Sequence, residues 1–147
     1  MLKIPPPILA LCLVTTIYFS ENKFEIIYFP YQHSISILLF SVGIFILIIP
    51  VLKFIKSKTT VNPVKFIKVN KLVNTGIYKY SRNPMYLGMI LIVISTSIFY
   101  LNYYSIITPF IFYFWINEFQ IKREEVFLEE KFGKEYLSYK SKTRRWI

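Results

Sequence analysis

Polar residues that could bind an anion interrupt the apolar chain in the segment NTGIYKYSRNPMYLG, residues 74–88. Gly76 permits a tight turn, and Pro84 suits the first turn of a helix, where its missing N–H costs nothing. A helix start attracts anions through free N–H groups and its dipole, and Arg82 adds a forked cation. Aromatic faces are added by Tyr78 and Tyr86. The segment could hold a small zwitterion, although arginine and tyrosine are also common anchors at a membrane interface.

A second charged segment, QIKREEVFLEEKFGKEYLSYKSKTRRWI, occupies residues 120–147. Its apolar positions recur at spacings of four, four and three, which places on one helical face Leu128, Phe132, Tyr136 and Tyr139. We expect an amphipathic helix that either lies on lipid or folds back and closes a site over the first segment. Residues typical of an interfacial anchor follow near its end: Lys140, Lys142, Arg144, Arg145 and Trp146.

Apolar helices must position these two segments. The chain of 147 residues is 54% hydrophobic, which is too apolar for a soluble domain of this size. Uncharged runs predict four membrane spans at about 4–20, 34–52, 84–101 and 103–119. No cleavage site follows the first run, so we interpret it as a retained helix and not as a signal peptide. The last two spans together would exceed the hydrocarbon core of about 30 Å as one helix, so they form a tight hairpin that turns near residues 102–105.

The charges predict the orientation of these spans. The loop 53–82 holds eight basic residues and no acid, and the segment after Trp115 holds eight basic residues against six glutamates. The positive-inside rule therefore places this loop and both termini in the cytoplasm. We interpret the net charge of +10 as contact with anionic membrane lipids and expect no nucleic-acid partner. The predicted fold is an all-α integral membrane bundle of four transmembrane helices, a single domain over residues 1–147, with a cytoplasmic C-terminal amphipathic helix.

The composition also excludes several kinds of site. One histidine and one cysteine are too few for a zinc cluster within one chain, so no metal is expected. Four glycines leave no Gly-rich phosphate loop. The predicted spans carry no ionisable side chain away from their ends, which disfavours a proton-coupled transporter. A non-enzymatic transporter or assembly subunit remains the alternative to an enzyme.

Both charged segments resemble a known family. GIYKYSRNPMYLG resembles the GxYxxxRHPxYxG segment of the isoprenylcysteine carboxyl methyltransferase family, which is similar to the phospholipid N-methyltransferases. REEVFLEEKFGKEYLSYKSKTRRW resembles the terminal EExxLxxxFGxxYxxY block of that family. The two blocks occur in the family's order, and the resemblance covers the chain from about Asn62 to its end. It implies a membrane-embedded methyltransferase (EC 2.1.1.-) that uses S-adenosylmethionine and acts on a lipophilic small molecule or lipid at the cytoplasmic face.

The resemblance also implies the site residues, by matching positions. The implied cofactor contacts are Asn70, Lys71, Leu72, Val73, Tyr78, Arg82, Asn83, Pro84, Met85, Tyr86 and Glu124. The ammonium and ribose hydroxyls of the cofactor need an acceptor such as Glu124, and its carboxylate needs donors such as Arg82 or backbone N–H groups. The candidate catalytic residues are Arg82, Tyr86 and Glu125. Further candidates for positioning the acceptor or removing its proton are Tyr78 and Glu118.

Two positions depart from the family's pattern. Asn83 replaces the usual histidine, which keeps hydrogen-bonding capacity but loses any titratable role. Gln120 stands where eukaryotic members place an arginine for the substrate carboxylate, one helical turn before the acidic residue. The methyl acceptor is therefore open between the carboxyl group of a prenylated cysteine, a phospholipid amine and a small thiol. The oligomeric state is open as well.

Overall fold

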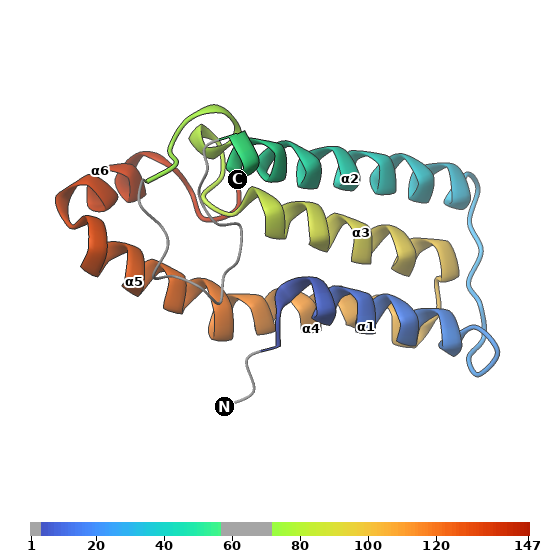
Figure 1. The fold of residues 1–147 in the computed structure, drawn as a ribbon. Coiled ribbons are helices and arrows are strands. Elements are labelled where there is room, and N and C mark those ends of the chain that lie inside the picture. Colours follow the sequence, from blue (N-terminus) through green and yellow to red (C-terminus); the bar gives the residue numbers. More distant parts are fainter. Residues whose placement is uncertain (1–3, 57–71) are drawn as a thin grey trace.

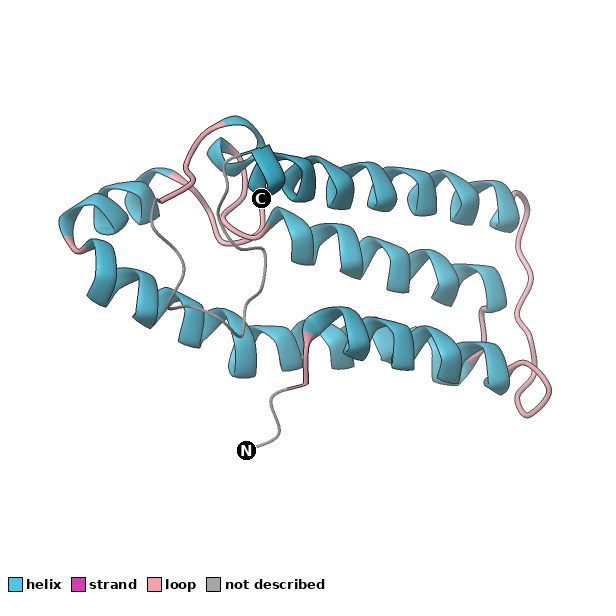
Figure 2. Cartoon of the chain, viewed as in Figure 1, coloured by secondary structure: helices cyan, strands magenta, loops and turns pink. Residues whose placement is uncertain are grey.

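The structure, a computed structural model, describes residues 4–56 and 72–147, and within these ranges the chain forms helices and loops without a strand (Figure 1, Figure 2). The all-α expectation is confirmed. The helices, in chain order, are α1 (Pro6–Ser20), α2 (Gln32–Lys56), α3 (Pro84–Tyr100), α4 (Tyr103–Trp115), α5 (Lys122–Phe132) and α6 (Lys134–Lys142). A 3₁₀ turn, Gly76–Lys79, precedes α3, and a π-helical turn, Ile116–Ile121, joins α4 to α5.

The helices differ in whether they are long enough to cross a bilayer. Among the described helices, α2 has the required length and composition over Gln32–Leu52, with a mean hydropathy of 2.9. The helices α1 and α3 are apolar but shorter. Each of these two begins with a proline, Pro6 or Pro84, in the first turn, where no intrahelical hydrogen bond is lost.

Helices α2 and α3 pack closely because two glycines let their backbones approach. A Cβ atom added to Gly88 would lie 2.8 Å from the carbonyl oxygen of Gly43, inside any normal contact distance. The hydroxyl of Ser36 in α2 donates to the carbonyl oxygen of Ser95 in α3 at 2.7 Å. Small residues at a helix crossing allow this kind of contact. The packing fixes the direction of α3, whose first turn carries the candidate site.

A buried polar cap closes the hairpin between α3 and α4. The side chain of Asn102 accepts from the backbone N–H of Ser105, and the Ser105 hydroxyl accepts from the backbone N–H of Asn102, which forms a capping box. The Asn102 amide also donates to the hydroxyl of Ser20 at the end of α1, at 2.9 Å. The turn therefore lies where the sequence predicts it and is attached to α1.

The core of the bundle is formed where α1, α3 and α4 meet. Its fully buried side chains are Ile17, Val93, Phe112, Ile116 and Ile121. These residues come from three helices and from the π-helical turn, so burying them stabilises the bundle and the start of the C-terminal segment together.

The C-terminal segment is not the single helix that the sequence predicts over residues 120–147. Gly133 has a φ of +49°, and it ends α5 and begins α6. Glycine adopts such a φ without the penalty that a Cβ imposes. The two helices project beyond the bundle at the end where α3 begins (Figure 1). Leu128, Phe132, Tyr136 and Tyr139, which were predicted to share a face, still pack together. They belong to a cluster that we call the aromatic cluster, whose other members are Leu72, Val73, Ile77 and Tyr78.

Candidate active site

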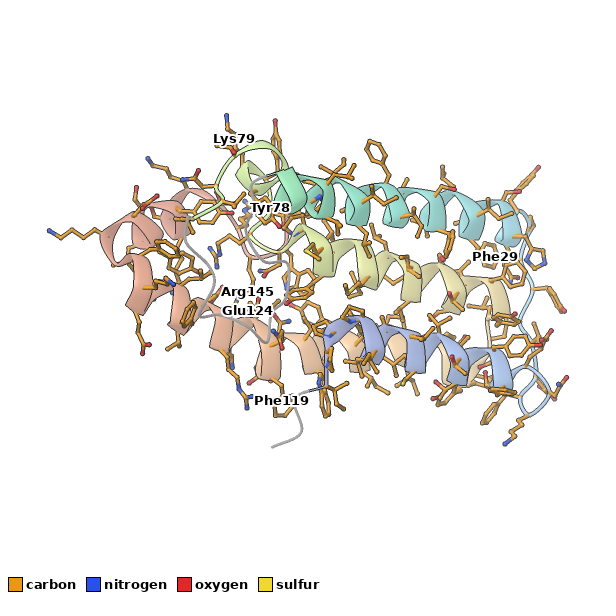
Figure 3. All side chains as sticks on the ribbon, viewed as in Figure 1. Phe29, Tyr78, Lys79, Phe119, Glu124 and Arg145 are labelled. Atoms are coloured by element: carbon orange, nitrogen blue, oxygen red, sulfur yellow. The ribbon has the colours of Figure 1, made fainter. Side chains whose placement is uncertain are left out.

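The start of α3 and the first turn of α5 are in direct contact. The Tyr86 hydroxyl donates to Glu124 Oε1 at 2.5 Å, and Arg82 Nη2 donates to Glu125 Oε1 at 2.8 Å. Figure 3 shows Tyr78, Glu124 and Arg145 near this end of the molecule, with Phe29 at the opposite end. The two charged segments identified in the sequence therefore meet in space.

Glu125 is the anion of a buried ion-pair network. Its side chain is 10% exposed and lies between two guanidinium groups, those of Arg82 and Arg145. Arg145 binds both carboxylate oxygens, with Nε 2.9 Å from Oε1 and Nη2 2.6 Å from Oε2. Burial alone would raise the pKa of Glu125, but the hydrogen bonds from Arg145 and Arg82 outweigh it and lower this pKa below its ordinary value. A carboxylate held in this way accepts protons poorly, so the contacts favour a structural counter-ion over the catalytic role that was expected.

Arg82 attaches the C-terminal tail, which we define as residues 140–147, to the start of α3. Its Nη1 donates to the carbonyl oxygens of Lys140, at 3.0 Å, and Thr143, at 2.6 Å, while Nη2 binds Glu125. Its backbone N–H donates to the carbonyl oxygen of Arg144 at 3.0 Å. Among the described residues, its buried Nε has no hydrogen-bond partner. Because both terminal nitrogens are already engaged, these contacts favour tail attachment over direct binding of a cofactor carboxylate.

Glu124 has uncharged partners, unlike its neighbour. The side chain is half-buried, and Oε1 accepts from the Tyr86 hydroxyl and from the side-chain amide of Gln120. Within residues 4–56 and 72–147, Oε2 has no hydrogen bond or ion pair. Burial raises the pKa of Glu124 to about 7, although the two hydrogen bonds oppose the shift. Glu124 can therefore change charge near neutral pH and has one oxygen available for an ammonium or hydroxyl group.

The tyrosines beside the glutamates serve as neutral hydroxyl groups. Tyr78 is buried in the 3₁₀ turn, and its burial raises the pKa of its hydroxyl. Burial also raises the pKa of Tyr139 to about 12, and its hydroxyl donates to the carbonyl oxygen of Tyr78 at 2.7 Å. Both hydroxyls stay protonated at neutral pH, so they can position neighbouring groups but cannot remove a proton.

The remaining predicted site residues differ in their surroundings. The Asn83 amide donates to the carbonyl oxygen of Arg145 at 2.9 Å, and Pro84 is buried as the first residue of α3, followed by the half-buried Met85. Leu72 and Val73 belong to the aromatic cluster. Glu118 is exposed and pairs with Lys122. Asn70 and Lys71 lie outside the described residues.

Three side chains at the site were missed or misassigned from the sequence: Gln120, Arg145 and Trp146. The Trp146 indole N–H donates to the side-chain oxygen of Asn117 in the π-helical turn at 3.3 Å. Arg145 and Trp146 therefore make contacts within the protein that their expected role as an interfacial anchor did not include. Helical spacing could not reveal this, because both residues follow the end of α6. The sequence does place arginines and a pair of glutamates in the same C-terminal segment. This composition indicates ion pairs but does not show which arginine pairs with which glutamate.

The chain is similar in sequence to known methyltransferases. Residues 31–135 match the phospholipid methyltransferase family, a family of S-adenosylmethionine-dependent enzymes. This match covers more than half of the chain, and the protein belongs to that family.

Two curated proteins are similar to parts of the chain. An uncharacterised protein of Haemophilus influenzae is 46% identical over 63 residues, which is 43% of this chain and all of that protein. The protein-S-isoprenylcysteine O-methyltransferase of Saccharomyces cerevisiae is 43% identical over 72 residues, which is 48% of this chain but 30% of the yeast protein. No solved structure matches the chain. The resemblance to both methyltransferase groups is confirmed.

Proposed function

We propose that this protein transfers a methyl group from S-adenosylmethionine to a lipophilic acceptor at the cytoplasmic face of a membrane, as an isoprenylcysteine carboxyl methyltransferase-like enzyme. The supporting observation is the direct contact between Tyr86 and Glu124, beside that between Arg82 and Glu125. These contacts give the two sequence blocks of the family one common site. Family membership limits the reaction to methyl transfer, and the geometry supports where it takes place.

The residues present fit this cofactor. Glu124 Oε2 is an acceptor for its ammonium or ribose hydroxyls, and the start of α3 offers backbone N–H groups to its carboxylate. Tyr78 and Tyr86 supply aromatic surface for its base. The cofactor, when bound, supplies an electrophilic methyl group. The chain must align the acceptor with that group and exclude water. Asn83, Pro84 and Met85 are also expected to line the cofactor site.

The acceptor decides whether a base is needed. A carboxylate or thiolate can be methylated directly, whereas an ammonium group must first lose a proton. Glu124, with its pKa near 7, is better suited to accept that proton than Glu125. A phospholipid amine, or a small thiol, is the alternative acceptor. The observation that favours these alternatives is Gln120, an uncharged side chain beside Glu124 at the position where a carboxylate acceptor would need a cation.

We propose that α1, α2, α3 and α4 span the membrane, with the last two forming a hairpin. The span-length α2 supports this arrangement, and the shorter helices α1 and α3 are also apolar. The end of the bundle that carries the site also carries the basic residues of α6, Lys134, Lys140 and Lys142. The positive-inside rule then places the site and both termini in the cytoplasm.

Calorimetric titration of detergent-purified protein with S-adenosylhomocysteine tests the proposal. We expect wild type to bind and Glu124→Ala to lose about 2 kcal/mol of binding free energy, roughly 30-fold in affinity, because a partly buried charge-assisted hydrogen bond is lost. Glu118→Ala is the matched control, since that exposed glutamate pairs with Lys122, and it should bind like wild type. If wild type does not bind, or if Glu124→Ala binds as tightly as wild type, the proposed site is wrong.

A second experiment identifies the acceptor. Protein incubated with methyl-labelled S-adenosylmethionine and a total lipid extract should produce a labelled lipid whose linkage is an ester, an amine or a thioether. Absence of any labelled product, from protein that binds S-adenosylhomocysteine, would contradict a lipid acceptor.

A further inference from the structure

We propose that Gln120 is a positioning residue that, together with Tyr86, orients the Glu124 carboxylate and favours its ionised form, with one oxygen left for the ligand. The inference rests on the proposed function only for the identity of that ligand. Neither the family match nor the resemblance gives Gln120 this role.

The geometry of the two donors carries the inference. The Gln120 amide and the Tyr86 hydroxyl both donate to Oε1 of Glu124, from the π-helical turn and from α3. Two donors on one oxygen fix the carboxylate plane and leave Oε2 without a partner among the described residues. Gln120 lies four residues before Glu124, and this spacing brings two side chains together on a helix.

The choice of uncharged donors has a chemical consequence. Hydrogen bonds to a carboxylate favour its ionised form, but an amide or a hydroxyl does not cancel its negative charge. Glu125 shows the contrast, because Arg82 and Arg145 neutralise it. When ionised, Glu124 carries a net negative charge that can pair with a cationic group of the ligand. The adjacent carboxylates therefore have separate roles, one structural and one for binding.

The other titratable groups around Glu124 do not replace Gln120. Tyr78 from the 3₁₀ turn and Tyr86 from α3 are neutral, and Glu125 on the same helix opposes ionisation of its neighbour. Gln120 is therefore one of two donors that favour the ionised form of the half-buried carboxylate and oppose the effect of burial. Removing it should shift the protonation equilibrium of Glu124, whereas a residue with only a packing role would leave that equilibrium unchanged.

Carbon-13 NMR of glutamate carboxyl groups in detergent-solubilised protein, titrated from pH 5 to 9, measures this equilibrium without any ligand. Glu124→Gln identifies the signal by its disappearance. Gln120→Leu should raise the titration midpoint by about one pH unit because a donor to the ionised form is lost. Gln120→Lys should lower it, because a cation then faces the carboxylate. Glu118→Gln, an exposed position in the same turn, should leave it unchanged.

The opposite shifts keep the test decisive if one variant folds poorly. Midpoints that match wild type in both Gln120 variants, or that move in the same direction, would overturn the inference. As a second readout, the affinity of wild type for S-adenosylhomocysteine should rise as the pH increases through about 7, and Gln120→Leu should displace that rise to higher pH. If wild type binds no S-adenosylhomocysteine, the proposed function fails, and the carboxyl titration still decides the role of Gln120.

Discussion

Glu124 and Glu125 are adjacent in sequence but have different chemical environments. Consecutive residues of a helix point in different directions, so Glu125 meets Arg82 and Arg145 while Glu124 meets Tyr86 and Gln120. The first environment lowers the pKa of its carboxylate, and the second leaves it raised by burial. The sequence motif identifies the pair of acids, but the contacts determine which of them can bind a ligand.

The ion-pair network predicts a large loss of stability when its anion is removed. Glu125→Ala would leave the buried guanidinium of Arg82 without its counter-ion, at a cost of about 3 kcal/mol. Glu129→Ala is a suitable control, because its pair with Lys140 is substantially exposed and should contribute less than about 1 kcal/mol. Unfolding of each variant in detergent, followed by circular dichroism, gives the comparison. Equal losses in the two variants would show that the network is not structural.

The raised pKa of Glu124 predicts how stability depends on pH. The folded protein binds this proton more tightly than the unfolded chain, whose glutamate pKa is near 4.5. Between about pH 4.5 and pH 7 the folded state therefore holds more protons, and the free energy of unfolding decreases as the pH rises through this window. Glu124→Gln should flatten that slope, as measured by unfolding at a series of pH values. An unchanged slope in the variant would mean that Glu124 titrates normally.

At the scale of the elements, hydrophobic patterning predicts the helices better than it predicts their ends. The uncharged runs become α1, α2, α3 and α4, since burial or lipid contact favours apolar helices. The break at Gly133 and the π-helical turn at Ile116–Ile121 were not predicted. The apolar spacing of four, four and three runs from Leu128 to Tyr139 across Gly133, so the spacing gives no sign of the break. The π-helical turn carries a long-range contact, the hydrogen bond between Trp146 and Asn117, which the order of residues does not reveal.

The glycine contact between α2 and α3 predicts an effect of a single methyl group. Gly88→Ala would place a Cβ atom 2.8 Å from the Gly43 carbonyl oxygen, so the two helices must separate. We expect a loss of about 1 to 2 kcal/mol in spite of the better helix propensity of alanine. Ser41→Ala, at an exposed position of α2, is the control. The thermal midpoint in detergent measures both, and a stabilised Gly88→Ala variant would contradict the packing.

At the scale of the whole molecule, the two ends of the bundle have different characters. One end holds the ion pairs and titratable groups of the candidate site, and the other is closed by the polar cap of Asn102, Ser105 and Ser20. The residues at the first end could be predicted from the sequence, because they belong to the two motifs and to the charged segments. The docking of the C-terminal tail could not be predicted in this way, because Arg82 binds backbone carbonyl oxygens there, and every residue has one.

This polarity predicts the membrane topology. In a Cys12→Ala background, which removes the one cysteine of the chain, the exposed positions Tyr103 and Ser141 can each be changed to cysteine. A membrane-impermeant maleimide should label Ser141→Cys in inside-out vesicles and Tyr103→Cys in right-side-out vesicles. Labelling of both variants in the same vesicle preparation would contradict the proposed four spans.

The contacts between the C-terminal tail and the segment from the 3₁₀ turn to the start of α3 indicate which parts of the chain can change without disturbing the candidate site. Every hydrogen bond and ion pair given above for the candidate site joins residues between Tyr78 and Trp146. Under the proposed function, substitutions on the outer surface of α1 and α2 should therefore leave the binding of S-adenosylhomocysteine close to that of wild type.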